Sequence, residues 1–103
     1  MGSRMRKMLQ AMYFDWGGSQ DELKAFEKSW KAGCDDCEGI DYMALYAPNN
    51  QKWHYAMFWE TDNYHRWQEA AEIAQKKYGG EGRDYNKMTH AVFEIWIPYE
   101  YPK

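Results

Sequence analysis

The sequence predicts one small α+β domain with the order strand, helix, strand, strand, helix, strand (βαββαβ). Two segments, 19–33 and 61–78, carry apolar residues at helical spacing behind capping residues. Apolar strand patterns occupy the four other segments, which are 7–16, 40–47, 52–60 and 88–97. Right-handed crossovers then place both helices on one face of a four-stranded antiparallel sheet, with the first and third strands in its centre.

The first strand, Lys7 to Trp16, is expected to lie in the middle of the sheet. Its two sets of alternating residues are Met8, Gln10, Met12 and Phe14 on one side and Leu9, Ala11 and Tyr13 on the other. Because both sets are largely apolar, the pattern is typical of a strand that is covered on both faces. The pair Gly17-Gly18 then ends it.

The two helices have recognisable starts. Ser19-Gln20-Asp21-Glu22 is a capping box, and the first helix is expected to end at Gly33 as its C′ residue. Its buried stripe is Leu23, Phe26 and Trp30. Thr61 or Asp62 caps the second helix. The stripe of the second helix is Tyr64, Trp67, Ala71, Ala74 and Tyr78, and its alanines allow a close approach to the sheet.

Strand alternation assigns side chains to faces. Pro48-Asn49-Asn50 is a turn, so the second and third strands form a hairpin. In the third strand, Trp53, Tyr55, Met57 and Trp59 share one face, and His54, Ala56, Phe58 and Glu60 share the other. In the last strand, the two faces carry Ala91, Phe93, Ile95 and Ile97 and, opposite them, His90, Val92, Glu94 and Trp96.

Length and charge limit the function. The 103 residues suffice for one domain, expected from Met5 to Lys103. The net charge of -3, with scattered Lys and Arg, argues against nucleic-acid binding. No apolar run approaches the roughly 20 residues of a membrane span. Residues 1–7 lack the apolar core of a secretory signal. Two cysteines are too few for a disulfide framework, so we expect a cytoplasmic protein.

One face of the predicted sheet has no helix to cover it. It nevertheless carries apolar side chains, among them Phe58, Val92 and Trp96. Aromatic residues make up 18% of the chain, which is high for so small a domain. A bare apolar face indicates a partner, so we expect a homodimer in which two such faces oppose each other. The tail Tyr99-Glu100-Tyr101 is expected to pack across that partner.

Three features carry a resemblance to a known family. They are the strand Met8–Phe14, the hairpin Gly39–Trp59, and Trp59-Glu60-Thr61-Asp62 leading into Tyr64 and Trp67. In these the chain resembles the dimeric α/β barrel (ferredoxin-like) superfamily, and antibiotic-biosynthesis-monooxygenase-like domains in particular. The resemblance implies two sheets that face each other across a barrel, often with one ligand pocket per subunit. It implies no single activity, since members include cofactor-free monooxygenases, heme-degrading enzymes, isomerases and proteins without a known reaction.

The heme-degrading branch of this superfamily usually has a Trp in the second helix and a His about three turns later. Trp67 is present here, but Lys77 stands ten residues on, and no His occupies the rest of that helix. The comparison with the family therefore predicts no heme, and we expect no cofactor.

Cys34-Asp35-Asp36-Cys37 is the one motif-like cluster, and it is compatible with a redox pair or half a zinc site. A helix C-terminus and two carboxylates disfavour a thiolate, and a second ligand pair is missing. We therefore expect a loop with incidental cysteines that hold no metal and are dispensable for folding.

Candidate catalytic residues are His54, His90 and Glu94. His90 and Glu94 share a strand face, and His54 can approach them only across the first strand, with Met12 or Tyr13 between them. If that face lines the barrel, this set can bind a polar group or move a proton. The other interpretation is a hydrogen-bonded structural pair or a face open to water. His65, in the first turn of the second helix, is expected at the surface.

Aromatic side chains could bind a planar ligand beside these residues, or form core and dimer interface instead. The candidates for ligand binding are Tyr13, Tyr42, Phe58, Trp59 and Trp96. We therefore expect a small-molecule-binding protein, in one reading a cofactor-independent monooxygenase acting on an aromatic substrate. The alternative is a dimeric ligand-binding or structural protein without catalysis. Metal binding ranks third, because the sequence contains no nucleotide loop, nucleophile elbow or metal-spaced ligand set.

Overall fold

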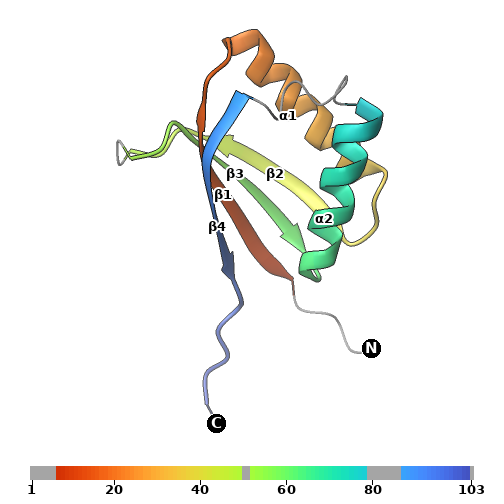
Figure 1. Cartoon of the computed structure of the whole chain (residues 1–103). Coiled ribbons are helices and arrows are strands. Elements are labelled where there is room, and N and C mark those ends of the chain that lie inside the picture. Colours follow the sequence, from red (N-terminus) through yellow and green to blue (C-terminus); the bar gives the residue numbers. More distant parts are fainter. Residues whose placement is uncertain (1–6, 50–51, 79–86, 103) are drawn as a thin grey trace.

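The computed structural model describes residues 7–49, 52–78 and 87–102, and it confirms the predicted βαββαβ order (Figure 1). The elements are β1 (Met8–Trp16), α1 (Gln20–Asp35), β2 (Ile40–Tyr46), β3 (Tyr55–Thr61), α2 (Tyr64–Ile73), the π-helical turn η1 (Ala74–Tyr78) and β4 (Met88–Trp96). No helix among these residues is long and apolar enough to cross a membrane.

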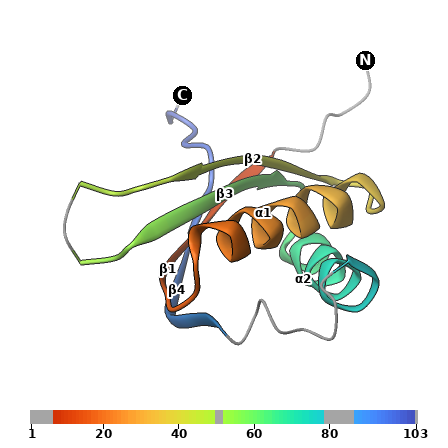
Figure 2. The ribbon, with the colours of Figure 1, turned by 90° about the horizontal axis from the view of Figure 1, so that it is seen from above.

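The four strands form one antiparallel sheet in the order β2-β3-β1-β4, with β1 and β3 central as predicted. Both helices lie on one face of this sheet and leave the other face uncovered (Figure 2). We call these the helix-covered face and the helix-free face. Ala11 on β1 lies opposite Phe58 on β3 and Glu94 on β4, so these three side chains share the helix-free face.

The helix-covered face forms the core. Alternate residues of the central strands meet the stripe of α1, and the buried set comprises Met12, Phe14, Trp16, Leu23, Phe26, Trp30, Met57 and Trp59. The capping box is formed as predicted: the Ser19 Oγ accepts the Glu22 N–H at 3.1 Å, and the Glu22 Oε1 accepts the Ser19 N–H at 2.8 Å.

Gly33 does not end α1, contrary to the prediction, because the helix continues to Asp35. A Cβ atom on Gly33 would lie 2.8 Å from the Ala70 carbonyl oxygen and 2.9 Å from the Ala74 Cβ. Glycine is therefore required where α1 and α2 touch. Ala70 of α2 and Ala74 of η1 form this contact with α1.

The cap of α2 also differs from the prediction. Asn63 is the N-cap, and its Oδ1 accepts the Arg66 N–H at 3.2 Å. Thr61 is unavailable because it ends β3 and its buried hydroxyl lies 2.9 Å from the Gly39 carbonyl oxygen. Asp62 faces Arg66 instead, with 3.7 Å between its Oδ1 and the Arg66 Nε. The stripe of this helix is partly as expected, with Ala74 buried, Trp67 and Ala71 half-buried and Tyr64 exposed. The Tyr78 side chain lies outside the described part.

Candidate functional site

Gln10 is the one polar side chain of β1 that points into the helix-covered core. It lies between Trp59 on β3 and Ile95 on β4 and is fully buried. Neither its amide nitrogen nor its amide oxygen has a hydrogen-bond partner among the described residues. A buried polar group without a partner costs about 1–3 kcal/mol. Gln10 was not among the predicted site residues, although a lone amide in an otherwise apolar strand face was the available signal.

Trp59, the neighbour of Gln10 on β3, belongs to a cluster of three tryptophans. Trp30 of α1, Trp59 of β3 and Trp67 of α2 have ring centroids 4.6, 5.3 and 5.7 Å apart. The Trp67 indole N–H has no partner in the described part of the chain. The Trp59 N–H makes no bond of normal hydrogen-bond geometry, although it lies near the thiol of Cys34, which is a weak acceptor. The tryptophan cluster therefore lies beside polar groups without a partner in the described part, the Gln10 amide and the Trp67 indole N–H.

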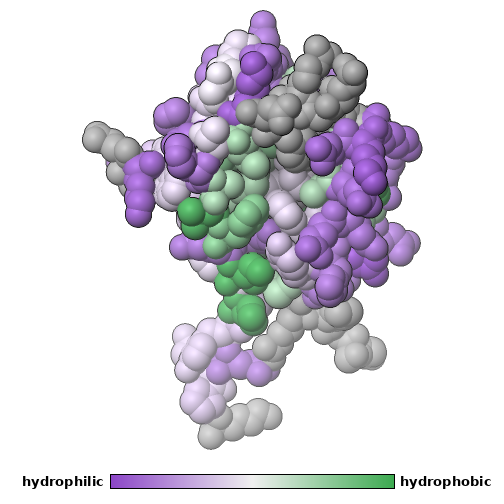
Figure 3. Space-filling model, in the orientation of Figure 1, coloured by the Kyte–Doolittle hydropathy of each residue, from purple (hydrophilic) through white to green (hydrophobic). Residues whose placement is uncertain are grey.

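The seam between α2 and β4 connects this place with the surface. The half-buried Trp67 ring packs edge-on against Phe93, with centroids 5.1 Å apart, and stacks on Tyr64 at 6.0 Å. Phe93 and Ile95 remain 42% and 41% exposed. Figure 3 shows hydrophobic side chains gathered along β4 beside the hydrophilic surface of α2.

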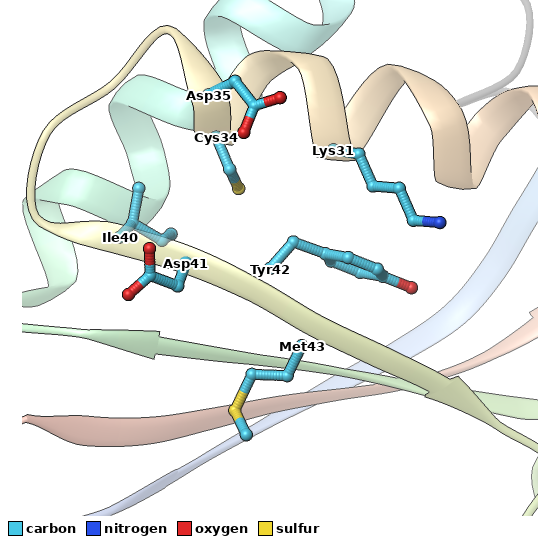
Figure 4. Close-up of a pocket in the computed structure, with 7 residues that line it drawn as sticks. All are labelled: Lys31, Cys34, Asp35, Ile40, Asp41, Tyr42 and Met43. Carbon is cyan, nitrogen blue, oxygen red and sulfur yellow. The ribbon is translucent and has the colours of Figure 1, made fainter.

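A hollow on the helix-covered side lies between α1 and the edge strand β2 (Figure 4). It encloses about 280 Å³ and is lined by Lys31, Cys34, Asp35, Ile40, Asp41, Tyr42 and Met43. The Tyr42 hydroxyl donates to the Glu27 Oε2 at 2.6 Å, and burial together with this carboxylate raises the pKa of Tyr42. Its ring lies 6.0 Å from that of Trp59. Tyr42 and Trp59, two predicted ligand-binding residues, therefore lie beneath the helices.

The cysteines occupy different surroundings, and the expectation of a loop is wrong for Cys34. Cys34 lies in the last turn of α1 and is buried in the core, where burial raises the pKa of its thiol to about 12. Cys37 is half-buried, with its sulfur 3.6 Å from the Glu69 Oε1, and burial and this carboxylate raise the pKa of its thiol. Among the described residues no three His, Cys, Asp or Glu side chains gather as a metal site.

On the helix-free face, Asp15 of β1 connects the two histidines of interest. The Asp15 Oδ1 accepts the His54 backbone N–H at 3.1 Å and lies 3.8 Å from the His54 Nε2. The Asp15 Oδ2 lies 3.3 Å from the His90 Nδ1. The Trp16 backbone N–H donates to the His54 Nδ1 at 3.0 Å. His54 and His90 thus approach each other across β1, as expected, but at Asp15 rather than at Met12 or Tyr13.

A bulge in β4 directs His90 toward Asp15. Thr89 pairs with Asp15 and Val92 with Tyr13, so β4 places two residues, His90 and Ala91, opposite one. His90 has a φ of 55°, a left-handed conformation that is uncommon for residues other than glycine. Its side chain remains 75% exposed in the single chain.

Glu94 contacts a different partner from the one predicted. It lies opposite Ala11 and beside Tyr13, and burial together with the Glu94 carboxylate raises the pKa of the Tyr13 hydroxyl. Phe58, half-buried, packs on Tyr46 with centroids 5.5 Å apart, and Trp96 is 50% exposed. The helix-free face therefore combines the His54–Asp15–His90 cluster, the Tyr13–Glu94 pair and exposed aromatic rings. His65 is exposed, as expected.

Comparison with known proteins supports the fold alone. No family model matches the chain, and no curated protein matches it. The chain is similar in structure to SnoaB, a cofactor-independent oxygenase from Streptomyces nogalater, with a TM-score of 0.67, 10% identity, and coverage of 93% of this chain and 96% of that one. It is also similar to a dimeric ferredoxin-like protein from an uncultured marine organism, with a TM-score of 0.58, 16% identity and coverage of 95% and 92%. A dabb family protein with a ferredoxin-like fold from Mesorhizobium loti gives a TM-score of 0.66 at 11% identity, with coverage of 92% and 99%. The ferredoxin-like fold is thereby confirmed.

Proposed function

We propose that this chain forms a homodimer through its helix-free face and that each subunit binds a small aromatic molecule between the sheet and the helices. The observation that carries the proposal is the fully buried Gln10 amide, which has no partner in the described part of the chain. A buried amide in an aromatic core reduces stability unless something bonds to it. A ligand oxygen is the simplest group that would satisfy it.

The walls of the site define the class of ligand. Three indole rings within 6 Å of one another offer flat apolar surfaces, which suit a planar ring system. The Gln10 amide can donate and accept a hydrogen bond, and the Trp67 N–H can donate one. This combination favours an aromatic molecule with a carbonyl or hydroxyl group at its edge.

The enzymatic form of the proposal is a cofactor-independent monooxygenase, and the fold shared with SnoaB supports it. Without a cofactor, the aromatic substrate must itself supply the electrons. A ring CH₂ group would become C=O while one O₂ is consumed, one oxygen atom entering the product and the other leaving as water. The alternative is binding without turnover, and oxygen uptake in the presence of a bound aromatic ligand separates the two.

The test of binding uses tryptophan fluorescence, because three indoles line the site. A naphthol should quench it, and naphthalene, which lacks the oxygen, should bind more weakly. The Gln10→Leu variant should lose about tenfold or more in naphthol affinity, the loss expected for one buried hydrogen bond. Met12→Leu is the matched control, because Met12 is a buried neighbour on the same face of β1. Equal affinity of Gln10→Leu and the parent protein would contradict the proposal.

The homodimer has its own support. One neighbouring structure is described as dimeric, and the helix-free face exposes Val92, Trp96 and Tyr46 to water in the single chain. Light scattering at micromolar concentration should give twice the chain mass, and a stable monomer would contradict this part. The Tyr99–Tyr101 tail extends away from the body of the domain (Figure 1), and its packing on the partner stays a prediction, as does the cytoplasmic location.

A further inference from the structure

We propose that the His54–Asp15–His90 cluster is a second site, which takes a proton from a weakly acidic hydroxyl group such as that of a phenol or an enol. The cluster is distinct from the ligand site beneath the helices. Asp15 belongs to the odd-numbered side chains of β1 that point to the helix-free face, whereas Gln10 points into the core. The two sites therefore lie on opposite sides of one strand.

His90 is the base. Its Nδ1 lies 3.3 Å from the Asp15 Oδ2, and this neighbouring carboxylate favours the tautomer with the ring proton on Nδ1. The lone pair of Nε2 is then free to accept a proton from a ligand. The Asp15 carboxylate, with a side chain only 25% exposed, stabilises the imidazolium that forms.

His54 has the opposite tautomer. The Trp16 backbone N–H donates to its Nδ1 at 3.0 Å, which requires an unprotonated Nδ1 and leaves the proton on Nε2. That Nε2 lies 3.8 Å from the Asp15 Oδ1, so both rings border the same carboxylate. A metal ion would need the Nε2 lone pair that this tautomer lacks. The arrangement therefore favours proton transfer over metal binding.

The proposed step is a simple acid–base exchange. The hydroxyl proton moves to the His90 Nε2, and the electron pair of the broken O–H bond stays on the ligand oxygen. The resulting oxyanion is held by the His54 Nε2–H and by the neighbouring imidazolium. Nothing is oxidised or reduced. Of the other ionisable groups on this face, Tyr13 pairs with Glu94 and Lys7 pairs with Asp41, and Glu60 and Tyr46 lie on β3 and β2.

The backbone supports a role for His90 beyond packing. Its left-handed conformation, at a φ of 55°, is disfavoured for histidine, and the β4 bulge is what brings the ring to Asp15. Strained residues of this kind concentrate at functional sites. Asn, Asp or Gly would adopt the conformation more readily but could not supply the imidazole.

The experiment uses para-nitrophenol, whose phenolate absorbs visible light. Bound to the parent protein, it should show a ratio of phenolate to phenol about tenfold higher than in buffer at the same pH, because an imidazolium lies beside the oxygen. Asp15→Asn and His90→Gln should remove this increase. His65→Gln is the matched control, since His65 is exposed on α2 and contacts Gln68 rather than the cluster. An unchanged ratio in His90→Gln, or no increase in the parent, would overturn the proposal.

A measurement on Gln10→Leu separates this cluster from the ligand site beneath the helices, and NMR of the parent protein tests the tautomers directly. Gln10→Leu should retain the increase in phenolate, so failure of the ligand site beneath the helices would not count against this cluster. Nitrogen NMR of the imidazoles in the parent protein needs no variant that might fail to fold. It should place the neutral-form proton of His90 on Nδ1 and that of His54 on Nε2, and the reverse assignment would overturn the proposal.

Discussion

The two faces of the sheet hold their polar groups in opposite ways. On the helix-covered face, Gln10 is neutral, fully buried and without a partner among the described residues. On the helix-free face, His54 and His90 each contact Asp15, and both histidine side chains are more than half exposed in the single chain. The first arrangement costs free energy through desolvation, and the second through the backbone conformation of His90.

Gln10 and His90 are therefore the two positions at which we expect the free energy of unfolding to be lower than the fold requires. Most of β1 fits the packing that its position demands, since Met12, Phe14 and Trp16 are buried in the core. Gln10 departs from the rule that buried polar groups are hydrogen-bonded, and His90 departs from the rule that a positive φ favours glycine. We expect Gln10→Leu and His90→Gly to be more stable than the parent protein. Residues that break a local rule without an evident gain in stability are candidates for function.

The largest expected effect compares a tryptophan on each face. Trp59→Ala should lower the free energy of unfolding by about 3–5 kcal/mol, because Trp59 is fully buried against Trp30 and Trp67. Trp96→Ala should cost about 1 kcal/mol or less within one chain, because Trp96 is half exposed. Urea unfolding measures both values. Light scattering of Trp96→Ala should show dissociation of the dimer. If urea unfolding gave similar losses of stability for Trp59→Ala and Trp96→Ala, the two faces would not differ in this way.

Gln10→Leu should stabilise the protein. Leu has a similar size and replaces an amide that pays a desolvation penalty of about 1–3 kcal/mol, so the free energy of unfolding should rise by up to that amount. Urea unfolding without ligand is the measurement. A loss of stability comparable to that of Trp59→Ala would mean that the amide is bonded in solution.

The helix-covered face should also control stability at high pH. Burial raises the pKa of Cys34 from 9.0 to about 12, so the folded protein keeps this proton while the unfolded chain releases it. Between pH 9 and pH 12 the unfolded chain therefore binds fewer protons, and stability falls as pH rises, by up to about 1.4 kcal/mol per pH unit for this one group. Tyr42, whose pKa is also raised, adds to the fall.

Cys34→Ser isolates the contribution of the thiol. Whatever its stability at pH 7, its free energy of unfolding should fall less steeply above pH 9 than that of the parent protein. Cys37→Ser is the comparison and should change the slope less, because Cys37 is only half-buried and only the Cys34 pKa rises as far as about 12. Parallel pH curves for Cys34→Ser and the parent would show that Cys34 is not protected by burial.

The smallest expected effect concerns His90. His90→Gly removes the disfavoured left-handed conformation, so the free energy of unfolding should rise by about 0.5–1 kcal/mol after allowance for the flexibility of glycine in the unfolded chain. The same variant should lose the phenolate signal. Destabilisation by more than 1 kcal/mol would show that the contact with Asp15 is structural.

The sequence predicted those parts of the fold that depend on local signals. The capping box at Ser19 and the alternation along β1 need only neighbouring residues, and both were confirmed. The roles of Gly33 and Asn63 depend on contacts between α1 and α2 and on the end of β3, which lie far apart in the sequence. Local rules therefore assigned these residues wrongly.

The candidate site was less predictable for the same reason. Alternation placed His54 and His90 near each other across β1, but the bulge at His90 selected Asp15 as their shared neighbour. Likewise, alternation alone does not decide which strand face the helices cover, so Tyr42 and Trp59 were grouped with residues of the opposite face. Gln10 was visible in the sequence, but only the structure shows that its amide is buried without a partner.

The most direct test of the contrast between the faces is the melting temperature of the parent protein and of Gln10→Leu, each with and without a naphthol. A ligand that binds the folded state stabilises it. Naphthol should raise the melting temperature of the parent more than that of Gln10→Leu, which starts from the higher value. An equal increase in both proteins, with Gln10→Leu the less stable of the two, would contradict this expectation.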